Sequence, residues 1–378
     1  MSVYWSAKTR NLQPYVPGEQ PAKQSFGAVK LIKLNTNENP YPPSPLVIEA
    51  IEKAAVETLR LYPDPASTEL REAIAQRYGL KASEVFPGNG SDEVLAFVFP
   101  AFFESGAQSI HFPDITYSFY PVYANLWDIP FTTIPLEDDF SINAAVYSRL
   151  MSEGKSGGII FPNPNAPTGI LLSVEEIRKI AEAAKQNKKV LVVDEAYIAF
   201  AEEDGGKAGA GVSAVTLLNE FPNLLIVRTL SKEASLAGLR AGFALGSEEL
   251  IEGLCRVKDS FNSYPMDRLA QAGAAAVMKD YSYYDDINRR IIATRRRVSS
   301  GLESMGFRVL PSQANFLFAS PPSGSGKSAA EIFSALRERG IIVRHFNKPR
   351  IADYLRISIG TDEEMDIFLN ECERIFNF

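Results

Sequence analysis

The chain has 378 residues, 46% of them hydrophobic and 22% charged, a composition that is typical of a folded globular protein and excludes wholesale disorder. At about 150 residues per domain, this length predicts about two domains. The 46 acidic residues outnumber the 39 basic ones, so neither a nucleic acid nor an anionic membrane surface is an expected partner. Two cysteines and two histidines are too few for a disulfide scaffold or a zinc ribbon, and we expect no metal site.

The sequence contains no segment that predicts membrane insertion or secretion. No apolar run approaches the ~18 residues that a membrane-spanning helix needs. Residues 1–15 are polar and aromatic, without the basic patch and apolar stretch of a secretory signal. We therefore expect a cytoplasmic enzyme.

The N-terminal part of the chain is predicted to be an arm followed by helices. Residues 1–40 are rich in Pro, Gly and aromatic residues and show no long period, so we expect them to lie on another surface. Apolar residues then recur every three or four positions over 45–61, which is a helix pattern. A second helix is predicted over 67–78, with Ser67 as its N-cap, and a third begins near Ser91.

Short and nearly continuous apolar runs follow, separated by helical segments. They are SIHF (109–112), FTTI (131–134), GGIIF (157–161), KVLVVDEAY (189–197), NLLIVRTLS (223–231) and AGFALG (241–246). Helices are predicted between them over 173–186 and 212–221. Such an alternation is typical of a mainly parallel sheet covered by helices on both faces, so the predicted fold class is α/β.

The C-terminal part of the chain has a different character. The longest helix is predicted over 270–304, and shorter ones over 329–339 and 362–378. Strands are predicted at FRVL, NFLFA, GIIVR and YLRISIG, between residues 307 and 360. We therefore divide the chain into an arm (1–40), a large α/β domain (41–255) and a smaller α+β domain (256–378), with the arm packing on the small domain or on a partner subunit.

Polar side chains follow three of the predicted strands at their carboxyl ends. Asn165 lies in the turn after one strand, Asp194 and Tyr197 follow the next, and Lys232 follows the third. In an open parallel sheet, ligands bind outside the carboxyl ends of the strands. We therefore expect an amide, a carboxylate, a phenol and an amine to meet in one crevice.

Pyridoxal phosphate is the cofactor that requires this set of groups. It needs a lysine for a Schiff base and a carboxylate against its ring nitrogen, and Lys232 and Asp194 are the candidates. Its phosphate needs hydroxyls, a guanidinium and backbone N–H groups at the start of a helix. The candidates for this phosphate site are Thr229, Ser231, Arg240, Gly90, Ser91 and Asp92.

At these residues the chain resembles the fold type I aminotransferases that use pyridoxal phosphate, and within them the histidinol-phosphate aminotransferase branch. The motifs that carry the resemblance are NLQPY, LNTNENPYPP, LYPDP, GNGSDE, ITYSFY, PNAPTG, VVDEAYIAF, RTLSKEASLAGLRAGF, ANFLFA, GIIVRHF and YLRISIGT. They run in order from about residue 10 to residue 361. The resemblance implies a mostly parallel seven-stranded sheet and transfer of an amino group between histidinol phosphate and 2-oxoglutarate.

The resemblance also implies roles for individual residues. Lys232 is the Schiff-base lysine, Asp194 the partner of the ring nitrogen and Tyr197 the donor to the ring oxygen. Tyr117 stacks on the cofactor ring, and Tyr62 reaches the cofactor phosphate of the neighbouring subunit, which implies a homodimer with shared active sites. On the substrate side the matching residues are Arg356, which would clamp a carboxylate or the phosphorylated end, together with Arg344, Tyr15, Asn37 and Asn315.

One position departs from the family pattern. Family members often carry an asparagine directly before Pro-Thr-Gly, and its side chain binds the ring oxygen of the cofactor. This chain has Ala166 there and Asn165 one residue earlier. Asn165 would then reach over to the ring oxygen, or Tyr197 would work alone with water. We predict that the cofactor still binds, because one neutral hydrogen bond contributes about 1 kcal/mol.

Other functions remain as alternatives. Relatives in the same branch act on aromatic amino acids, and a further relative decarboxylates phosphothreonine. A sensor that binds the cofactor without turnover would usually carry an added nucleic-acid-binding module, which is not expected here. The segment Gly324–Ser328 resembles a nucleotide-binding loop, but Pro321 stands where that motif requires glycine.

Overall fold

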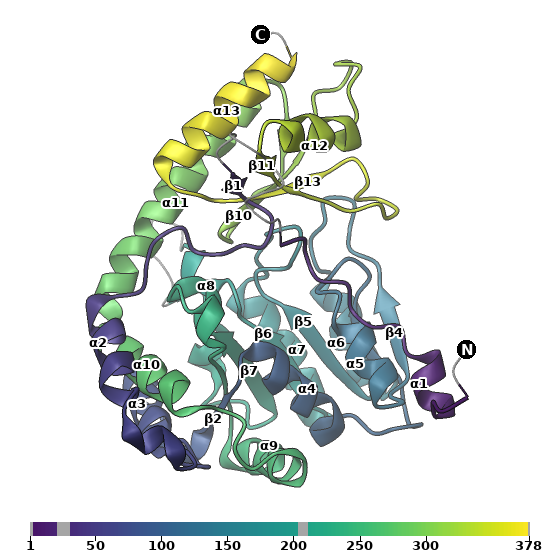
Figure 1. The fold of residues 1–378 in the computed structure, drawn as a ribbon. Coiled ribbons are helices and arrows are strands. Elements are labelled where there is room, and N and C mark those ends of the chain that lie inside the picture. The colour runs from purple at the N-terminus through teal and green to yellow at the C-terminus, as the bar shows by residue number, and fades with distance from the viewer. Residues whose placement is uncertain (1–2, 21–30, 203–210, 377–378) are drawn as a thin grey trace.

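A twisted seven-stranded sheet with helices on both faces forms the lower part of the molecule in Figure 1. The structure, a computed structural model, describes residues 3–20, 31–202 and 211–376. The strand order is β2-β8-β7-β6-β5-β3-β4, and β8 runs antiparallel to both of its neighbours, whereas the other pairs are parallel. The prediction of a mostly parallel seven-stranded sheet is therefore confirmed. The strands are β2 Val85–Gly88, β3 Ile110–Pro113, β4 Phe131–Ile134, β5 Gly158–Pro162, β6 Leu191–Asp194, β7 Leu224–Thr229 and β8 Gly242–Leu245.

Helices cover both faces of this sheet with their apolar sides, which explains why its central strands are continuously apolar. On one face, residues of α4 (Ser91–Phe102), α5 (Tyr120–Leu126) and α9 (Glu248–Phe261) share a core with Val192 and Leu225. On the other face, residues of α3, α6, α7 and α10 share a core with Val193 and Ile226. These helices are α3 Thr68–Tyr78, α6 Ala144–Ser152, α7 Val174–Gln186 and α10 Arg268–Lys279.

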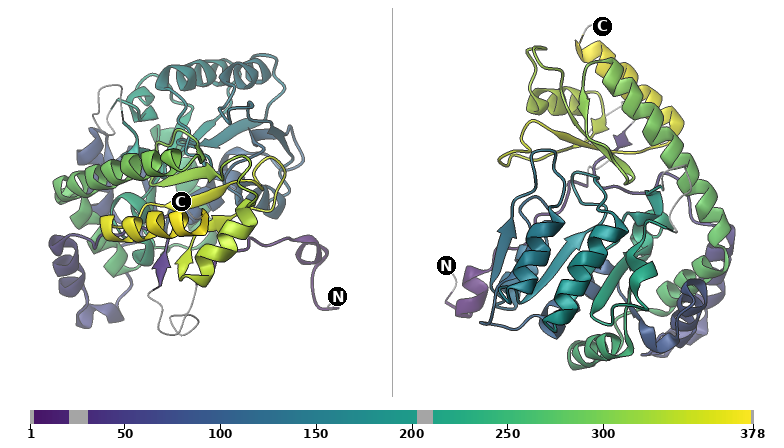
Figure 2. Two further views of the ribbon diagram at one scale, coloured as in Figure 1. Left: turned by 90° about the horizontal axis from the view of Figure 1, so that it is seen from above. Right: turned by 180° about the vertical axis from the view of Figure 1, so that it is seen from behind.

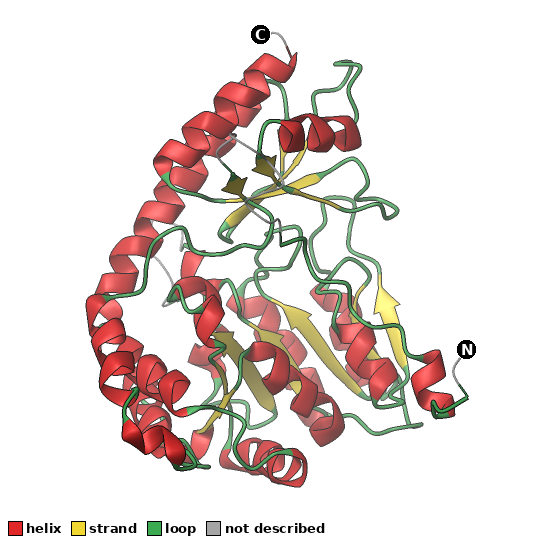
Figure 3. Cartoon of the chain, viewed as in Figure 1, coloured by secondary structure: helices red, strands yellow, loops and turns green. Residues whose placement is uncertain are grey.

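A smaller layer of strands and helices lies above the large sheet (Figure 3). Its antiparallel sheet has the order β12-β13-β10-β9, and β1 of the arm pairs with β11 in parallel. These strands are β1 Ile32–Lys33, β9 Arg308–Val309, β10 Phe316–Ser320, β11 Ile341–Ile342, β12 Arg344–His345 and β13 Leu355–Ser358. The helices are α11 Tyr281–Ser304, α12 Ala329–Glu338 and α13 Asp362–Phe376, and α11 and α13 lie side by side in both views of Figure 2.

Short elements complete the fold. They are α1 Ala7–Asn11, α2 Pro45–Ala54, α8 Leu230–Glu233 and the 3₁₀ helices η2 Glu57–Arg60, η3 Ala82–Glu84, η4 Ile198–Phe200, η5 Ala214–Leu217 and η6 Ala237–Leu239. None of the helices within the described residues is long and apolar enough to cross a membrane.

Several predicted helices differ from those of the structure. The helix predicted over 45–61 ends at Ala54 and is followed by η2, and the one predicted over 212–221 is the single 3₁₀ turn η5. Ser67 is in the left-handed region at φ 50° and makes no capping hydrogen bond. The carboxylate of Asp64 accepts instead from the N–H groups of Ala66 and Thr68, at 2.9 and 2.7 Å, so it satisfies donors at the start of α3.

The helix predicted over 270–304 is two helices, α10 and α11, which meet at Asp280 (φ −121°, ψ 38°). The break lets the Ala-rich face of α10 pack on α2 and α3 while α11 continues into the smaller layer. Residue 255, our predicted domain boundary, lies inside α9, which packs on α4. The division into domains therefore stays a proposal, and this packing favours a boundary within α11.

Candidate active site

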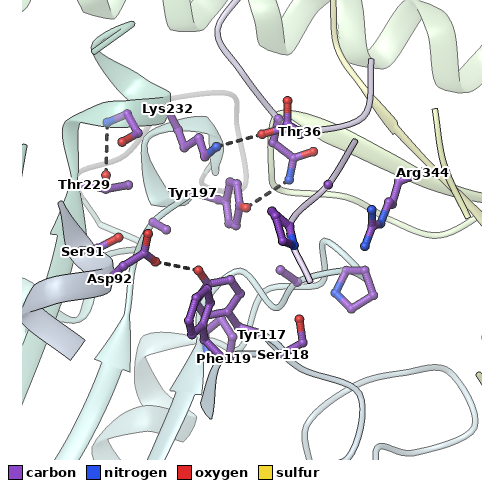
Figure 4. Close-up of a pocket in the computed structure, with 18 of the residues that line it drawn as sticks. Thr36, Ser91, Asp92, Tyr117, Ser118, Phe119, Tyr197, Thr229, Lys232 and Arg344 are labelled. Atoms are coloured by element: carbon purple, nitrogen blue, oxygen red, sulfur yellow. Dashed lines mark hydrogen bonds between the residues drawn. The ribbon is translucent and has the colours of Figure 1, made fainter. Parts of the chain in front are cut away.

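A cavity of about 300 Å³ opens between the carboxyl ends of the large sheet's strands, the arm and the smaller layer. Most of the predicted site residues line it, although they come from segments far apart in the sequence (Figure 4). Those that line it are Tyr15, Asn37, Ser91, Asp92, Tyr117, Asp194, Tyr197, Thr229, Ser231, Lys232, Arg240, Arg344 and Arg356. The strand ends thus bring together the predicted carboxylate, phenol and amine, whereas the predicted amide of Asn165 does not line the cavity.

Lys232 lies in the single turn α8, which directly follows β7. Its Nζ donates to the carbonyl oxygen of Thr36 in the arm at 2.9 Å, and its own carbonyl accepts from Asn39 at 3.0 Å. Burial, together with the positive charges of Arg356 and Arg240, lowers the pKa of the Lys232 amine to about 8. A larger fraction of this amine is therefore neutral near neutral pH than for an ordinary lysine, and the neutral amine is the form that attacks a carbonyl carbon.

Asp194 ends β6, and its side chain is almost completely buried. It accepts hydrogen bonds from the Tyr120 hydroxyl at 3.0 Å and from the Ala196 N–H at 3.2 Å. Burial raises the pKa of this carboxyl to about 7, and the nearby negative charges of Asp92 and Glu195 add to the rise. A positively charged ring nitrogen placed here would relieve that cost, so the site fits the pyridinium of pyridoxal phosphate.

The predicted phosphate site lies at the N-terminus of α4. The N–H groups at this end of a twelve-residue helix provide donors and the positive end of its dipole. Arg240 approaches from the other side, 3.4 Å from the hydroxyl of Ser231 and 3.1 Å from the carboxylate of Asp92. Gly90 does not line the cavity. Its lack of a side chain leaves room for Arg240, because a Cβ at Gly90 would lie 2.5 Å from an Arg240 nitrogen.

Two tyrosines approach the place where a cofactor ring would lie. The Tyr117 hydroxyl donates to Asp92 at 2.6 Å, which ties the ring that is predicted to stack on the cofactor to the phosphate site. The Tyr197 oxygen accepts from Nδ2 of Asn37 at 3.0 Å, so its own proton is left to donate elsewhere (Figure 4). Asn315 does not line the cavity, but it is buried and donates to the carbonyl of Asn37 at 3.0 Å, so it supports a residue of the cavity wall.

The other half of the cavity is cationic and aromatic. The guanidinium carbons of Arg344 and Arg356 each lie 5.6 Å from the ring centre of Phe346. Tyr15 stacks on Phe119 with 4.1 Å between the ring centres. This half can therefore hold an anionic group and an aromatic ring.

Besides Gly90, two further predicted cofactor residues, Asn165 and Tyr62, do not line the cavity. The amide of Asn165 donates to the carbonyl of Ile115 and to the hydroxyl of Thr168, at 3.0 and 3.1 Å, while Ala166 lines the cavity. Of the two alternatives for the ring oxygen, the geometry therefore favours Tyr197 without Asn165. Tyr62 is 79% exposed on the surface, outside the cavity.

The segment Gly324–Ser328 is part of the loop between β10 and α12 and does not line the cavity. Gly324 and Gly326 have φ values of 80° and 69°, in the left-handed region that favours glycine, so the conformation of the turn accounts for both. Ser328 and Glu331 form the capping box of α12. A structural role thus accounts for this segment.

Some residues of the site were not predicted. Phe346 and Thr36 line the cavity, where Phe346 lies close to both arginines and Thr36 binds Lys232. Tyr120 does not line the cavity but binds Asp194. Tyr120 and Phe346 stand in the motifs ITYSFY and GIIVRHF, next to residues that were predicted, but nothing in their spacing distinguishes them from core aromatics.

The fold and the donor set together define a pyridoxal-phosphate-dependent transferase of fold type I. A family model described as aminotransferase class I and II matches residues 29–371, and the chain belongs to this family. It is 53% identical over 377 residues to histidinol-phosphate aminotransferase 1 of Bordetella parapertussis, with all of both chains covered. It is also 53% identical to the histidinol-phosphate aminotransferase of Clostridium acetobutylicum, with 98% of each chain covered.

The solved structures include a similar fold with the cofactor bound. The crystal structure of histidinol-phosphate aminotransferase from Sinorhizobium meliloti in complex with pyridoxal-5'-phosphate matches with a TM-score of 0.85 and 25% identity. The match covers all of this chain and 98% of that one.

Proposed function

We propose that this chain is a histidinol-phosphate aminotransferase that uses pyridoxal phosphate and 2-oxoglutarate. The observation that carries the proposal is one cavity with two separate anion sites. Arg240 and the start of α4 form the first, beside Lys232, and Arg344 and Arg356 form the second. A cofactor phosphate would occupy the first and the anionic end of the amino donor the second. The identity to the full-length relatives supports the same assignment, and a cytoplasmic location is part of the proposal.

The residues of the chain divide the chemistry among them. Pyridoxal phosphate, when bound, supplies an electron-accepting ring that stabilises negative charge at the donor's α-carbon. Lys232 would hold the cofactor covalently and, once released, would move a proton from that carbon. Asp194 would keep the ring nitrogen positively charged, and the Tyr197 proton would bind the ring oxygen. Arg356 and Arg344 would orient the donor, while the Tyr15–Phe119 pair would contact its ring.

The amino donor can be tested through Arg344, which is not needed for the cofactor in this proposal. We expect the wild type to use histidinol phosphate faster than phenylalanine or phosphothreonine in a side-by-side rate comparison. We expect Arg344→Ala to lower kcat/KM for histidinol phosphate by about 10- to 100-fold, because a charge-assisted contact contributes about 1.5–3 kcal/mol. Phenylalanine, which has no phosphate, should lose less than about threefold.

The aromatic pair Tyr15–Phe119 also fits a phenyl ring, so an aromatic amino acid aminotransferase is the second candidate. A wild type that prefers phenylalanine, together with an Arg344→Ala variant that keeps its rate with histidinol phosphate, would contradict the first assignment and support the second. A conservative Arg344→Lys variant is the control, since it keeps the charge but not the paired donors.

We also propose that the protein works as a homodimer. Exposed apolar side chains gather around α2, η2 and the end of α9, including Leu59, Leu61 and Phe261, which are 54%, 50% and 70% exposed. Tyr62 belongs to this group and stacks on Tyr264, with 4.7 Å between the ring centres. An interface over this patch would cover the apolar surface and carry Tyr62 toward the active site of the other subunit.

Mixed dimers test this sharing of residues. Tyr62→Ala and Lys232→Ala are each expected to be poorly active alone at limiting cofactor. After co-refolding in equal amounts, about one quarter of all sites should be intact, because only mixed dimers combine Lys232 of one chain with Tyr62 of the other. Activity that stays at the sum of the two parents would contradict a shared site.

A further inference from the structure

Arg228 is a buried arginine in β7 that the chemistry described above does not use. Its side chain is 6% exposed, with Nη1 3.1 Å from Oε2 of Glu195 and Nη2 donating to Oε2 of Glu233 at 2.9 Å. Glu195 directly follows Asp194, and Glu233 directly follows Lys232. One guanidinium therefore joins the two carboxylates that are adjacent in sequence to the two residues on which cofactor chemistry depends.

The alternation of side chains along the strands puts this ion cluster and the cavity on opposite faces of the sheet. Asp194 and Thr229 line the cavity, and Asp194 is bound to Tyr120 of α5. Arg228, one residue before Thr229, lies instead over the ring of Tyr78 of α3, at 5.7 Å from its centre. The cluster is therefore placed to support the cavity floor from behind, without touching substrate or cofactor.

Further hydrogen bonds fix both carboxylates. Glu195 accepts from the hydroxyl of Ser213 and from the N–H of Ala214, each at 2.7 Å. Glu233 accepts from the hydroxyl of Tyr281, the first residue of α11, at 3.3 Å. An unpaired buried charge is costly, so any movement that breaks these contacts raises the free energy of the folded state. The backbone turns that carry Glu195 and Glu233 therefore have little freedom to move.

We propose that Arg228 is a positioning residue that sets the distance and orientation between Lys232 and Asp194 by bridging Glu233 and Glu195. The bridge needs a planar group with several donors, because one side chain must reach two carboxylates at once. Lysine has the same charge, but its donors share one nitrogen, which cannot occupy the places of Nη1 and Nη2 at once, so it cannot hold both carboxylates where they lie. This inference rests on the proposed function, since it concerns the cofactor that Lys232 and Asp194 would hold.

The test is Arg228→Lys in the full chain loaded with pyridoxal phosphate. When the two carboxylates are no longer held at their separate positions, α8 gains freedom and water reaches the nitrogen of Lys232. Burial then destabilises the protonated form of this nitrogen less than in the wild type. We expect the pH midpoint of the visible absorbance band of the lysine-bound cofactor to rise by about half a pH unit or more. We expect cofactor dissociation to be about tenfold faster and kcat about 100-fold lower, with KM for the donor within about twofold.

Arg295→Lys is the matched control. Arg295 is also a buried arginine, at 4% side-chain exposure. It binds Glu202 and the carbonyls of Phe200 and Ala314, and neither Arg295 nor these partners line the cavity. We expect Arg295→Lys to lower the melting temperature about as much as Arg228→Lys does, but to leave the absorbance midpoint and cofactor dissociation unchanged.

The outcomes separate the two claims. Suppose that the wild type shows a normal absorbance band and that Arg228→Lys changes neither its pH midpoint nor the rate of cofactor dissociation. The positioning role is then wrong, but the proposed function stands. A wild type that forms no band overturns the proposed function and this inference together. If Arg228→Lys does not fold, Glu233→Gln replaces it, because it keeps the shape and one hydrogen bond. Its midpoint should move in the same direction by a smaller amount, and an unchanged midpoint overturns the proposal.

Discussion

Lys232→Ala is expected to abolish both the visible absorbance of the bound cofactor and the transfer of amino groups. The side chain has two functions in the proposed mechanism, as the covalent anchor of the cofactor and as the proton carrier. Its loss should lower kcat by a factor of at least about 10⁴ with every donor. Absorbance spectra and single-turnover rates with histidinol phosphate measure the two functions separately.

Lys258→Met is the matched control for this variant. Lys258 is also a buried lysine, and its Nζ binds the carboxylate of Asp259 and the carbonyl of Pro65, at 2.6 and 3.2 Å, away from the cavity. We expect this control to lose stability but to keep the absorbance band. In the wild type, borohydride reduction and peptide mapping should place the cofactor on the peptide with Lys232. A label on any other lysine would contradict the whole assignment.

The cofactor half of the site could be predicted from the sequence because its geometry is local. Asp194 ends the buried strand β6 and Lys232 lies in the turn that follows β7, and the register of β6 on β7 pairs Asp194 with Val227, close to that turn. A topology rule, rather than the details of packing, brings such strand ends together. The same reasoning predicted most of the sheet itself, since β3 to β8 each overlap a predicted apolar run, whereas β2 does not.

The substrate half depends on contacts that local patterns do not contain. Asn37 and Tyr15 come from the arm, whereas Arg344 and Arg356 come from strands of the smaller layer, more than 300 residues later. Only the resemblance to a family could predict them. Asn165 is the opposite case. Its position in the turn after a predicted strand suggested a cofactor contact, but its amide donates to the carbonyl of Ile115 instead.

Two features of the fold could not be predicted from the sequence, and each has a physical reason. The edge strand β2 has the sequence VFPG, and Pro87 and Gly88 within it resemble a turn, although β2 pairs with β8 along its whole length. The break at Asp280 occurs between segments without proline or glycine at the junction, so no local signal marks it. Packing of α10 on α2 and α3 determines it.

Asp194→Asn is expected to have opposite effects on stability and on activity. In the chain without cofactor, the pKa of the Asp194 carboxyl rises from 3.8 to about 7 because the group is buried. Between these two pH values the folded state holds a proton that the unfolded state releases, so stability falls as pH rises through this window. At pH 8 the wild type carries the full cost of a buried negative charge, which the neutral amide avoids.

The expected gain in the free energy of unfolding of cofactor-free Asp194→Asn at pH 8 is at most roughly 4 kcal/mol, and it should shrink toward zero near pH 4. Denaturant unfolding at several pH values measures it. With pyridoxal phosphate bound, the same variant should lose about 10²- to 10³-fold in kcat, because an amide cannot hold the ring nitrogen positively charged.

Asp139→Asn is the control, and we expect it to change the stability at pH 8 in the opposite direction. Asp139 is exposed, and its hydrogen bond from Ser141 lowers the pKa of its carboxyl below 3.8. Its ionised form is therefore favoured in the folded state, so removing it should destabilise the chain slightly at pH 8 and less as pH falls through that pKa. If cofactor-free Asp194→Asn were less stable than the wild type at pH 8, Asp194 would already be satisfied as a carboxylate. The positively charged ring nitrogen would then not be needed to stabilise it.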